Sequence, residues 1–167
     1  MNITQEIMHS FDVTAPRELV WSFLWDPQAL ARCLQGCEDV VVVEEGKSYR
    51  VRVRRKVSVF VVGLELDITV LEREAGRYVR LEISGKDTRL RSELHLALLV
   101  SVDEIAPNEC RINLGATINL SGLLAALKKT LVSMQISQTL DDFATRLRSG
   151  IEEQASCLMV NPSPEKL

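Results

Sequence analysis

The pattern of apolar and polar residues predicts a long amphipathic helix from Leu123 to Ile151. This stretch contains no proline, and its single glycine, Gly150, lies at its end. Its apolar residues recur at intervals of three and four, in two sets: Leu124, Leu127, Leu131 and Met134, then Ile136, Leu140, Phe143, Leu147 and Ile151. At about 100° per residue, the step between the two sets moves the apolar stripe almost to the opposite side of the helix. We therefore expect the helix to contact two different surfaces or to kink near Ser133.

Alternation of apolar and polar residues predicts seven strands before this helix. The expected ranges are 3–13, 40–44, 49–62, 64–71, 78–84, 88–102 and 110–120. Two short helices are expected after the first strand, because Pro16 and Pro27 suit the first turn of a helix and Asp26 suits a cap. The first has Leu19, Val20, Phe23 and Leu24 on its inner face, and Gly36 ends the second.

This order of elements predicts an α+β fold. A seven-stranded curved antiparallel sheet would wrap around the long C-terminal helix, with the two short helices after the first strand. One helix cannot cover so broad an inner face, so we expect a cavity between sheet and helix. Nearly all inward side chains are aliphatic, so the cavity should favour apolar ligands and reject charge. The residues expected to line it are His9, Trp25, Tyr49, Leu66, Ile68, Leu81, Leu96, Leu98, Leu114, Leu127 and Leu131.

Composition and charge narrow the class of protein. The 167 residues suit one domain, expected over residues 1–152 and followed by a flexible tail over 153–167. The net charge of −3 gives no reason to expect nucleic acid as a partner. No apolar run reaches membrane-spanning length, and polar residues interrupt the first twelve positions, so neither a transmembrane segment nor a signal peptide is expected. Four cysteines, Cys33, Cys37, Cys110 and Cys157, are then most simply interpreted as reduced thiols in the cytoplasm.

Two kinds of residue offer candidate chemistry near the N-terminal end. Cys33 and Cys37 are four apart, which would suit a thiol pair or half of a metal site. Gly36 ends the helix between them and no cluster of Cys or His lies elsewhere, so we predict no metal and no other cofactor. His9 on the inner face of the first strand could act as an acid or base, or orient a ligand. A histidine in such a place is more often a hydrogen-bonded core residue.

A row of arginines, Arg50, Arg52 and Arg54, faces outward on the third predicted strand. Glu65 and Asp67 on the next strand can pair with them, which favours a cross-strand ladder of ion pairs over a binding patch. The inner face offers no paired carboxylates, no Ser/His/Asp set and no phosphate-binding loop, so no catalytic residue is assigned.

Two segments carry a resemblance to a known family. They read Phe11-x-Val13-x-Ala15-Pro16-x-x-Leu19-Val20-Trp21 and Asp26-Pro27-x-x-Leu30-Ala31-x-Cys33-Leu34-x-Gly36-Cys37-Glu38. Both resemble the opening of the family named after the G subunit of carbon monoxide dehydrogenase, and the second is the more specific. Gly85 and the segment Ser121-Gly122-x-Leu124-Ala125-x-Leu127 also fit, so the resemblance covers most of the chain from Ile7 to Leu147.

The resemblance implies a START-like (SRPBCC, helix-grip) fold and an accessory protein that binds a lipid- or quinone-like molecule. The implied partners are that apolar small molecule and a molybdenum hydroxylase complex, which some members assist in maturation or electron transfer. Peripheral contact with a membrane stays open. Two alternatives also stay open. One is an enzyme of the polyketide cyclase/dehydratase type using His9 or a tyrosine, and the other is an interaction protein with a filled core and no ligand.

Overall fold

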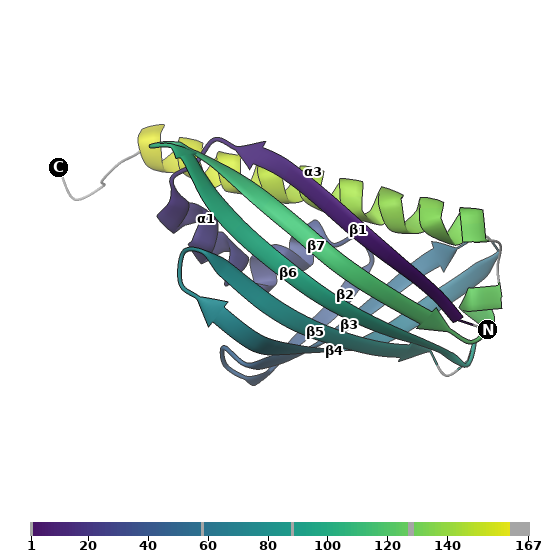
Figure 1. Cartoon of the computed structure of the whole chain (residues 1–167). Helices are drawn as coiled ribbons and strands as arrows, with labels where there is room; N and C mark the ends of the chain where they lie inside the picture. The colour runs from purple at the N-terminus through teal and green to yellow at the C-terminus, as the bar shows by residue number, and fades with distance from the viewer. Residues whose placement is uncertain (1, 58, 88, 127–128, 161–167) are drawn as a thin grey trace.

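The computed structural model describes residues 2–57, 59–87, 89–126 and 129–160. Within them, seven strands form one antiparallel sheet in the order β1-β7-β6-β5-β4-β3-β2 (Figure 1). The strands are β1 (Asn2–Val13), β2 (Cys37–Glu44), β3 (Ser48–Val57), β4 (Phe60–Glu74), β5 (Tyr78–Asp87), β6 (Ser92–Ala106) and β7 (Glu109–Ser121). The helices are α1 (Arg17–Leu24), α2 (Pro27–Cys33), the 3-10 segment η1 (Leu123–Ala126) and α3 (Lys129–Val160).

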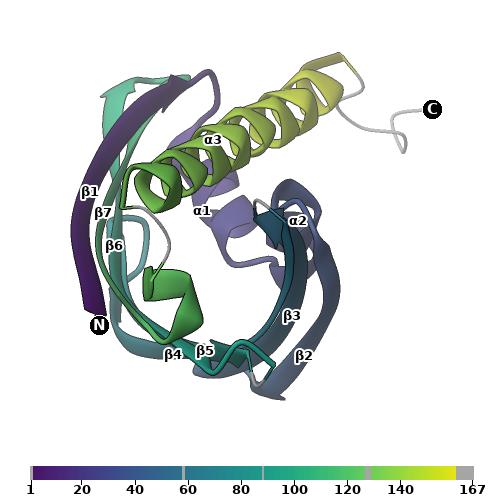
Figure 2. The same cartoon turned by 90° about the vertical axis from the view of Figure 1, so that its right-hand side faces the viewer.

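The predicted α+β helix-grip fold is confirmed. Figure 2 shows the sheet curling from β1 on one side to β2 on the other, with α3 lying across the open side. Helices α1 and α2 occupy the space after β1, where two short helices were expected. Asp26 caps α2 as predicted, because its carboxylate accepts hydrogen bonds from the backbone N–H groups of Gln28 (3.1 Å) and Ala29 (3.2 Å).

The hairpin between β3 and β4 differs from the prediction. A third strand was expected to run to residue 62, but β3 ends at Val57 and β4 begins at Phe60. Gly63 was taken as the break between strands, yet it lies inside β4, opposite Arg54. Glycine is compatible with both a turn and a strand interior, and here the pairing of β4 with β3 keeps the chain extended.

The turn before β6 also lies later than predicted. A turn was expected at Gly85-Lys86-Asp87 and a strand from residue 88, whereas β5 continues to Asp87 and β6 begins at Ser92. The buried carboxylate of Asp87 accepts hydrogen bonds from the backbone N–H groups of Gly63 (2.8 Å), Arg89 (2.9 Å) and Leu90 (3.1 Å). These three bonds place the turn after Asp87, not before it.

The long helix differs from the prediction at both ends. The predicted start is the 3-10 segment η1, and Leu127 lies outside the described residues. At the other end α3 continues to Val160, so residues 153–160 of the expected tail are helical, and Ala155 is buried. Residues 161–167 lie outside the described part.

The predicted switch of the apolar stripe near Ser133 is wrong. One stripe runs along α3 at intervals of three and four: Val132, Ile136, Leu140, Phe143, Leu147, Ile151 and Ala155. Leu131 and Met134, which belonged to the predicted first set, lie off this stripe, and Met134 is 49% exposed. Because α3 begins only at Lys129, the residues before it do not continue its helical register.

Two hydrophobic clusters join the helices to the sheet. The first lies among α1, α2, β6, β7 and the C-terminal half of α3, and Ile112, Leu147 and Ile151 are almost fully buried in it. The second lies near the start of α3 and comprises Ile3, Val62, Leu90, Leu120, Ala125 and Val132. Leu66, Ile68 and Leu96, on strands in the middle of the sheet, belong to neither cluster.

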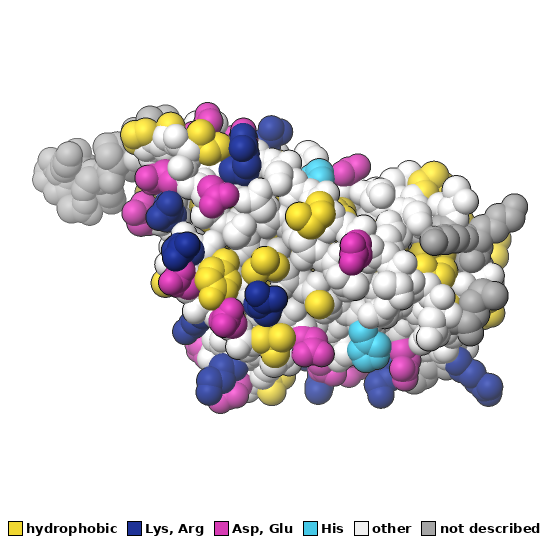
Figure 3. Space-filling view, viewed as in Figure 1, with side chains coloured by type: hydrophobic (Ala, Val, Ile, Leu, Met, Phe, Trp, Pro, Cys, Tyr) yellow, Lys and Arg dark blue, Asp and Glu magenta, His cyan; other side chains and the backbone are white. Residues whose placement is uncertain are grey.

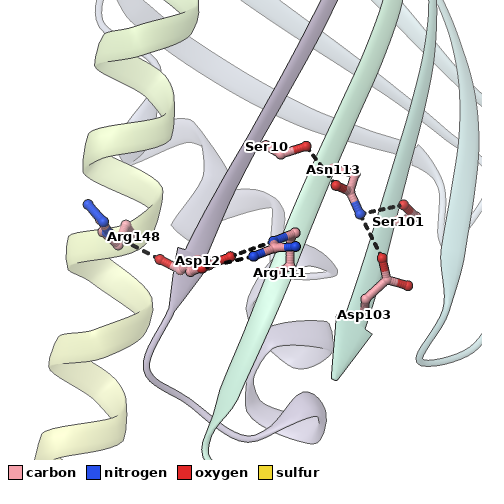
Figure 4. A network of polar contacts seen from close by, with 7 residues as sticks. All are labelled: Ser10, Asp12, Ser101, Asp103, Arg111, Asn113 and Arg148. Carbon is pink, nitrogen blue, oxygen red and sulfur yellow. Dashed lines mark hydrogen bonds and ion pairs between the residues drawn. The ribbon is translucent and has the colours of Figure 1, made fainter. Parts of the chain in front are cut away.

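A polar network on the outer face fastens β1 to its neighbours (Figure 4). Arg111 Nε and Nη2 donate to the carboxylate of Asp12 at 2.8 and 3.3 Å, and this hydrogen bond lowers the pKa of Asp12. Arg148 Nε of α3 donates to the backbone carbonyl of Asp12 (3.1 Å). Beside them, Asn113 bonds to Ser10, Ser101 and Asp103. Elsewhere on this face, apolar side chains are scattered among charged ones (Figure 3).

Candidate functional site

A cavity of about 510 Å³ lies between the concave face of the sheet and α3. This volume is within the range of about 300–1,000 Å³ that is usual for small-molecule sites. All seven strands contribute side chains to its wall, as do α1, α2 and α3. Residues of both hydrophobic clusters border the cavity, which therefore extends from one cluster to the other along the middle of the curved sheet.

The wall of the cavity is almost entirely aliphatic and aromatic. This follows from the period of two, because every second residue of each strand faces inward. The inward row of β4, for example, is Val62, Leu64, Leu66, Ile68 and Val70. The lining side chains that carry polar atoms are Trp25, Cys37, Tyr49, Arg55, Gln135 and Thr139. Arg55 is the one charged residue of the described wall.

Several of these polar groups bond to the backbone. Tyr49 Oη accepts a hydrogen bond from the backbone N–H of Gly46 (3.0 Å). Thr139 Oγ1 donates to the backbone carbonyl of Gln135 (2.8 Å), one turn earlier in α3. Cys37 Sγ donates to the backbone carbonyl of Asp39 (3.8 Å), and burial raises the pKa of the Cys37 thiol. The described wall therefore holds no thiolate nucleophile at neutral pH.

Trp25 stands at the cavity wall where α1 ends. Its ring packs edge-on against Trp21, with 5.8 Å between the ring centroids. The guanidinium carbon of Arg73 lies 4.8 Å from the centroid of the Trp25 ring, close enough for a cation–π contact. Trp25 is thus held from two sides while it also lines the cavity.

The structure places seven of the eleven predicted site residues in the cavity wall. They are Trp25, Tyr49, Leu66, Ile68, Leu81, Leu96 and Leu114. His9 is half-buried on the inner side of β1, with its ring 5.8 Å from that of Phe11, but it is outside the wall. Leu98 packs against the first hydrophobic cluster, and Leu131 lies off the apolar stripe of α3. Leu127 lies outside the described residues.

Sequence reasoning missed the part of the wall that the helices supply. From α2 and the residue after it come Pro27, Leu30, Ala31 and Leu34, and from α3 come Gln135, Ile136, Thr139, Leu140 and Phe143. It also missed Arg55, although a signal was present. The inward row of β3 is Tyr49, Val51 and Val53, and the same alternation continues to Arg55. The expectation that the cavity would contain no charge is therefore wrong at one position.

The predicted ladder of ion pairs is confirmed in part. Arg50 Nε lies 3.0 Å from Asp67 Oδ1 and 3.8 Å from Glu65 Oε1 across the β3–β4 pair. Arg54 pairs with Glu38 of β2 instead, at 3.7 Å. Arg52 lies opposite Glu65 in the pairing, but no ion pair joins it to any residue in the described part of the chain.

Other candidate chemistry is sparse over residues 2–57, 59–87, 89–126 and 129–160. No group of three or more His, Cys, Asp or Glu side chains in these ranges is arranged to hold a metal ion. The four cysteines are free, and Cys33 Sγ donates to the backbone carbonyl of Ala29 (3.4 Å). Burial raises the pKa of Cys33. None of the described helices is long and apolar enough to span a membrane.

Solved structures share this fold. A conserved protein from Geobacillus kaustophilus has a TM-score of 0.79 at 17% identity, over 92% of this chain and 96% of that one. A START superfamily protein from Mycobacterium smegmatis has a TM-score of 0.68 at 12% identity, over 89% and 98% of the two chains. The ZhuI aromatase/cyclase from Streptomyces sp. R1128 has a TM-score of 0.63 at 15% identity, over 94% and 96%. At these identities the likeness concerns the fold alone, which is START-like.

The sequence itself identifies the family. No functionally curated protein matches the chain. The sequence model of the CoxG family, described as the G subunit of carbon monoxide dehydrogenase, matches residues 10–152, which include all seven strands apart from the start of β1. The chain therefore belongs to the CoxG family of carbon monoxide dehydrogenase proteins.

Proposed function

We propose that this protein is an accessory protein that binds an apolar small molecule, of lipid-like or quinone-like chemistry, in the cavity beneath α3. The observation that carries the proposal is the cavity itself, about 510 Å³ with a wall that is almost wholly hydrophobic. Burial of apolar surface is worth roughly 25 cal/mol per Å². A ligand that buries about 300 Å² would gain roughly 7 kcal/mol before the costs of association are subtracted.

Polar groups of the wall would orient such a ligand. Tyr49 comes from β3 and Gln135 from α3, on different sides of the cavity. Within the described residues the side-chain amide of Gln135 makes no hydrogen bond, so its N–H group is available to a ligand carbonyl or hydroxyl. A few convergent polar groups in an apolar pocket are the usual means of fixing orientation. A ligand with one or two carbonyl groups on a hydrophobic body fits this arrangement.

Membership of the family supports a role beside a carbon monoxide dehydrogenase-related complex. A protein that holds a lipid- or quinone-like molecule could supply it to such a complex or accept it during maturation or electron transfer. We place this role in the cytoplasm, where free thiols such as those of Cys33 and Cys110 persist. The binding unit would comprise residues 1–152, with the later turns of α3 extending it.

A cyclase-type enzyme is the alternative, because ZhuI shares the fold. Tyr49 and Gln135 line the cavity, but the wall formed by the described residues contains no carboxylate and no histidine to move a proton. His9, the candidate base, lies outside this wall. We therefore prefer binding without chemistry.

Native mass spectrometry tests the proposal. Protein expressed in the cytosol and purified without detergent should show a species heavier than the 18.7 kDa chain by the mass of one small molecule. Denaturation should release that molecule for identification by its fragments. Protein stripped by solvent extraction and refolded is the control, and it should take up one added ubiquinone-1 or long-chain alcohol. Absence of both the co-purified and the added ligand would contradict the proposed function.

A further inference from the structure

The cavity contains one arginine whose position in β3 is unusual. Arg55 is the fourth residue of the inward row, after Tyr49, Val51 and Val53, and it pairs with Val62 of β4. It is half-buried among aliphatic neighbours. A charge placed beside an apolar surface loses solvation, which destabilises the protein unless another group compensates. An apolar residue at this position would have suited the core better.

Arg55 has no counter-charge in the described part of the protein. Most other arginines of the sheet have one, such as Arg50 with Asp67 (3.0 Å) and Arg111 with Asp12 (2.8 Å). The nearest candidate acids are committed elsewhere. Glu38 pairs with Arg54, and the carboxylate of Asp87 accepts three backbone hydrogen bonds. The wall itself contains no carboxylate among its described residues. The guanidinium is thus free to bind a group that enters the cavity.

The stem of the Arg55 side chain is held at the joint between α2 and β2. Arg55 Cδ lies 3.2 Å from the position where a Cβ on Gly36 would be, so the chain passes closely over this glycine. Gly36 has a positive φ of 88°, and its carbonyl accepts a hydrogen bond from the Arg54 N–H (2.8 Å). A side chain on Gly36 would collide with the Arg54 carbonyl. This joint therefore sets where Arg55 enters the cavity wall.

Position along β3 then sets the shape of a ligand. Tyr49 and Arg55 are six residues apart on the same face of one strand, which corresponds to about 20 Å. Between them the wall is formed by Val51, Val53 and the aliphatic rows of β4 and β5. An extended molecule lying along β3 would meet the charge at one end and only apolar or phenolic groups over the rest of its length.

We propose that Arg55 binds the anionic head group of an amphiphilic ligand whose apolar body lies along β3 toward Tyr49. The head group is a carboxylate or a phosphate monoester, because guanidinium matches both with two parallel hydrogen bonds. This inference rests on the proposed function and specifies its ligand class as a single-chain anion, such as a fatty acid or a monoalkyl phosphate. It assigns Arg55 the role of selecting charged over neutral amphiphiles.

A pair of probes that differ only in charge tests this assignment. The fluorescent fatty acid cis-parinaric acid and its methyl ester have the same apolar body. Titrations near pH 8, below the aggregation concentration of either probe, should give the acid an affinity about tenfold or more higher than the ester, as a charge-assisted hydrogen bond predicts. Hexadecyl phosphate and palmitate added as competitors distinguish the phosphate from the carboxylate. Equal affinities of acid and ester for the wild type would overturn the inference.

Variants on the same strand separate head-group binding from general effects. Arg55→Met should lower the affinity for the acid to that for the ester and leave the ester unchanged, while Arg55→Lys should retain most of the preference. The matched control is Arg52→Met, which removes the same charge from the outer face and should change neither affinity. Thermal unfolding checks that all variants fold. Equal weakening of acid and ester by Arg55→Met would contradict a head-group role.

Failure of the inference differs from failure of the proposed function. If the ester binds as tightly as the acid, the cavity takes neutral apolar molecules and only the role of Arg55 is lost. If neither probe binds and a neutral dye does not bind either, the cavity does not take apolar ligands, and both proposals are wrong.

Discussion

The two hydrophobic clusters and the cavity between them predict that equal truncations will have unequal costs. Leu147→Ala and Leu96→Ala both remove the same three carbons. Leu147 is 1% exposed, in the first hydrophobic cluster, where α3 meets the sheet. Leu96 is half-buried in the middle of β6, where it lines the cavity and belongs to neither cluster. The comparison therefore measures whether the middle of the sheet is filled.

The magnitudes follow from what surrounds each side chain. At Leu147 the loss of transfer free energy is about 2.4 kcal/mol, at about 0.8 kcal/mol per carbon. The void left in a close-packed region raises the total cost to about 3–5 kcal/mol. At Leu96 one side of the leucine already borders empty space, so fewer contacts are lost and the cost should be about 1–2 kcal/mol. For a chain of this length, these losses correspond to decreases in Tm of about 10–15 °C and about 3–6 °C.

Urea unfolding followed by far-UV circular dichroism, with thermal scans beside it, gives both free energies. The wild type and both variants should unfold with the same m-value, so that changes in midpoint report stability alone. A Leu96→Ala cost within about 0.5 kcal/mol of the Leu147→Ala cost would show that Leu96 is packed on all sides. That result would refute the cavity as described.

Three further predictions concern other parts of the molecule. Asp87→Ala should cost about 2–3 kcal/mol in urea unfolding, because three backbone N–H groups lose their acceptor, whereas Asp87→Asn should cost less. In denaturant all four cysteines should react with a thiol reagent without prior reduction, and a Cys33–Cys37 disulfide would contradict the free thiols. The Arg111 hydrogen bond lowers the pKa of Asp12 below 3.8, so its stabilising effect is present above that pH and lost below it. The stability difference between wild type and Asp12→Asn should therefore close as pH falls from 7 to 2, and a constant difference would argue against it.

The fold could be predicted from the sequence because the local patterns agree with each other. The alternation from Cys110 to Leu120 matches β7 to within one residue at each end, and Asp26-Pro27 begins α2 as expected. The turns were harder to place because Gly63 and Gly85 lie inside strands. Gly85 is required there for packing, since a Cβ would collide with Leu66 across the β4–β5 pair. A contact between distant residues of this kind cannot be inferred from one segment.

The cavity was predictable on its strand side and not on its helix side. A strand keeps its period of two wherever it begins, so Leu66, Leu96 and Leu114 could be assigned to the inner face. The stripe of a helix depends on where the helix starts, and the separate segment η1 moved that start. Arg55 was hidden for another reason. It lies in a run of three basic residues with Arg54 and Lys56, which resembles a solvent-exposed row.

The measurement that tests the central claim most directly is binding of the neutral dye N-phenyl-1-naphthylamine before and after the cavity is filled. Leu66→Trp and Leu96→Trp each place an indole in the cavity, and Arg52→Glu on the outer face is the control. We predict that the wild type and Arg52→Glu bind the dye, while both Trp variants lose binding with little change in unfolding free energy. If the wild type does not bind the dye, and both Trp variants are destabilised by about 1–3 kcal/mol or more as overpacked cores are, the interior is filled and the proposed cavity does not exist.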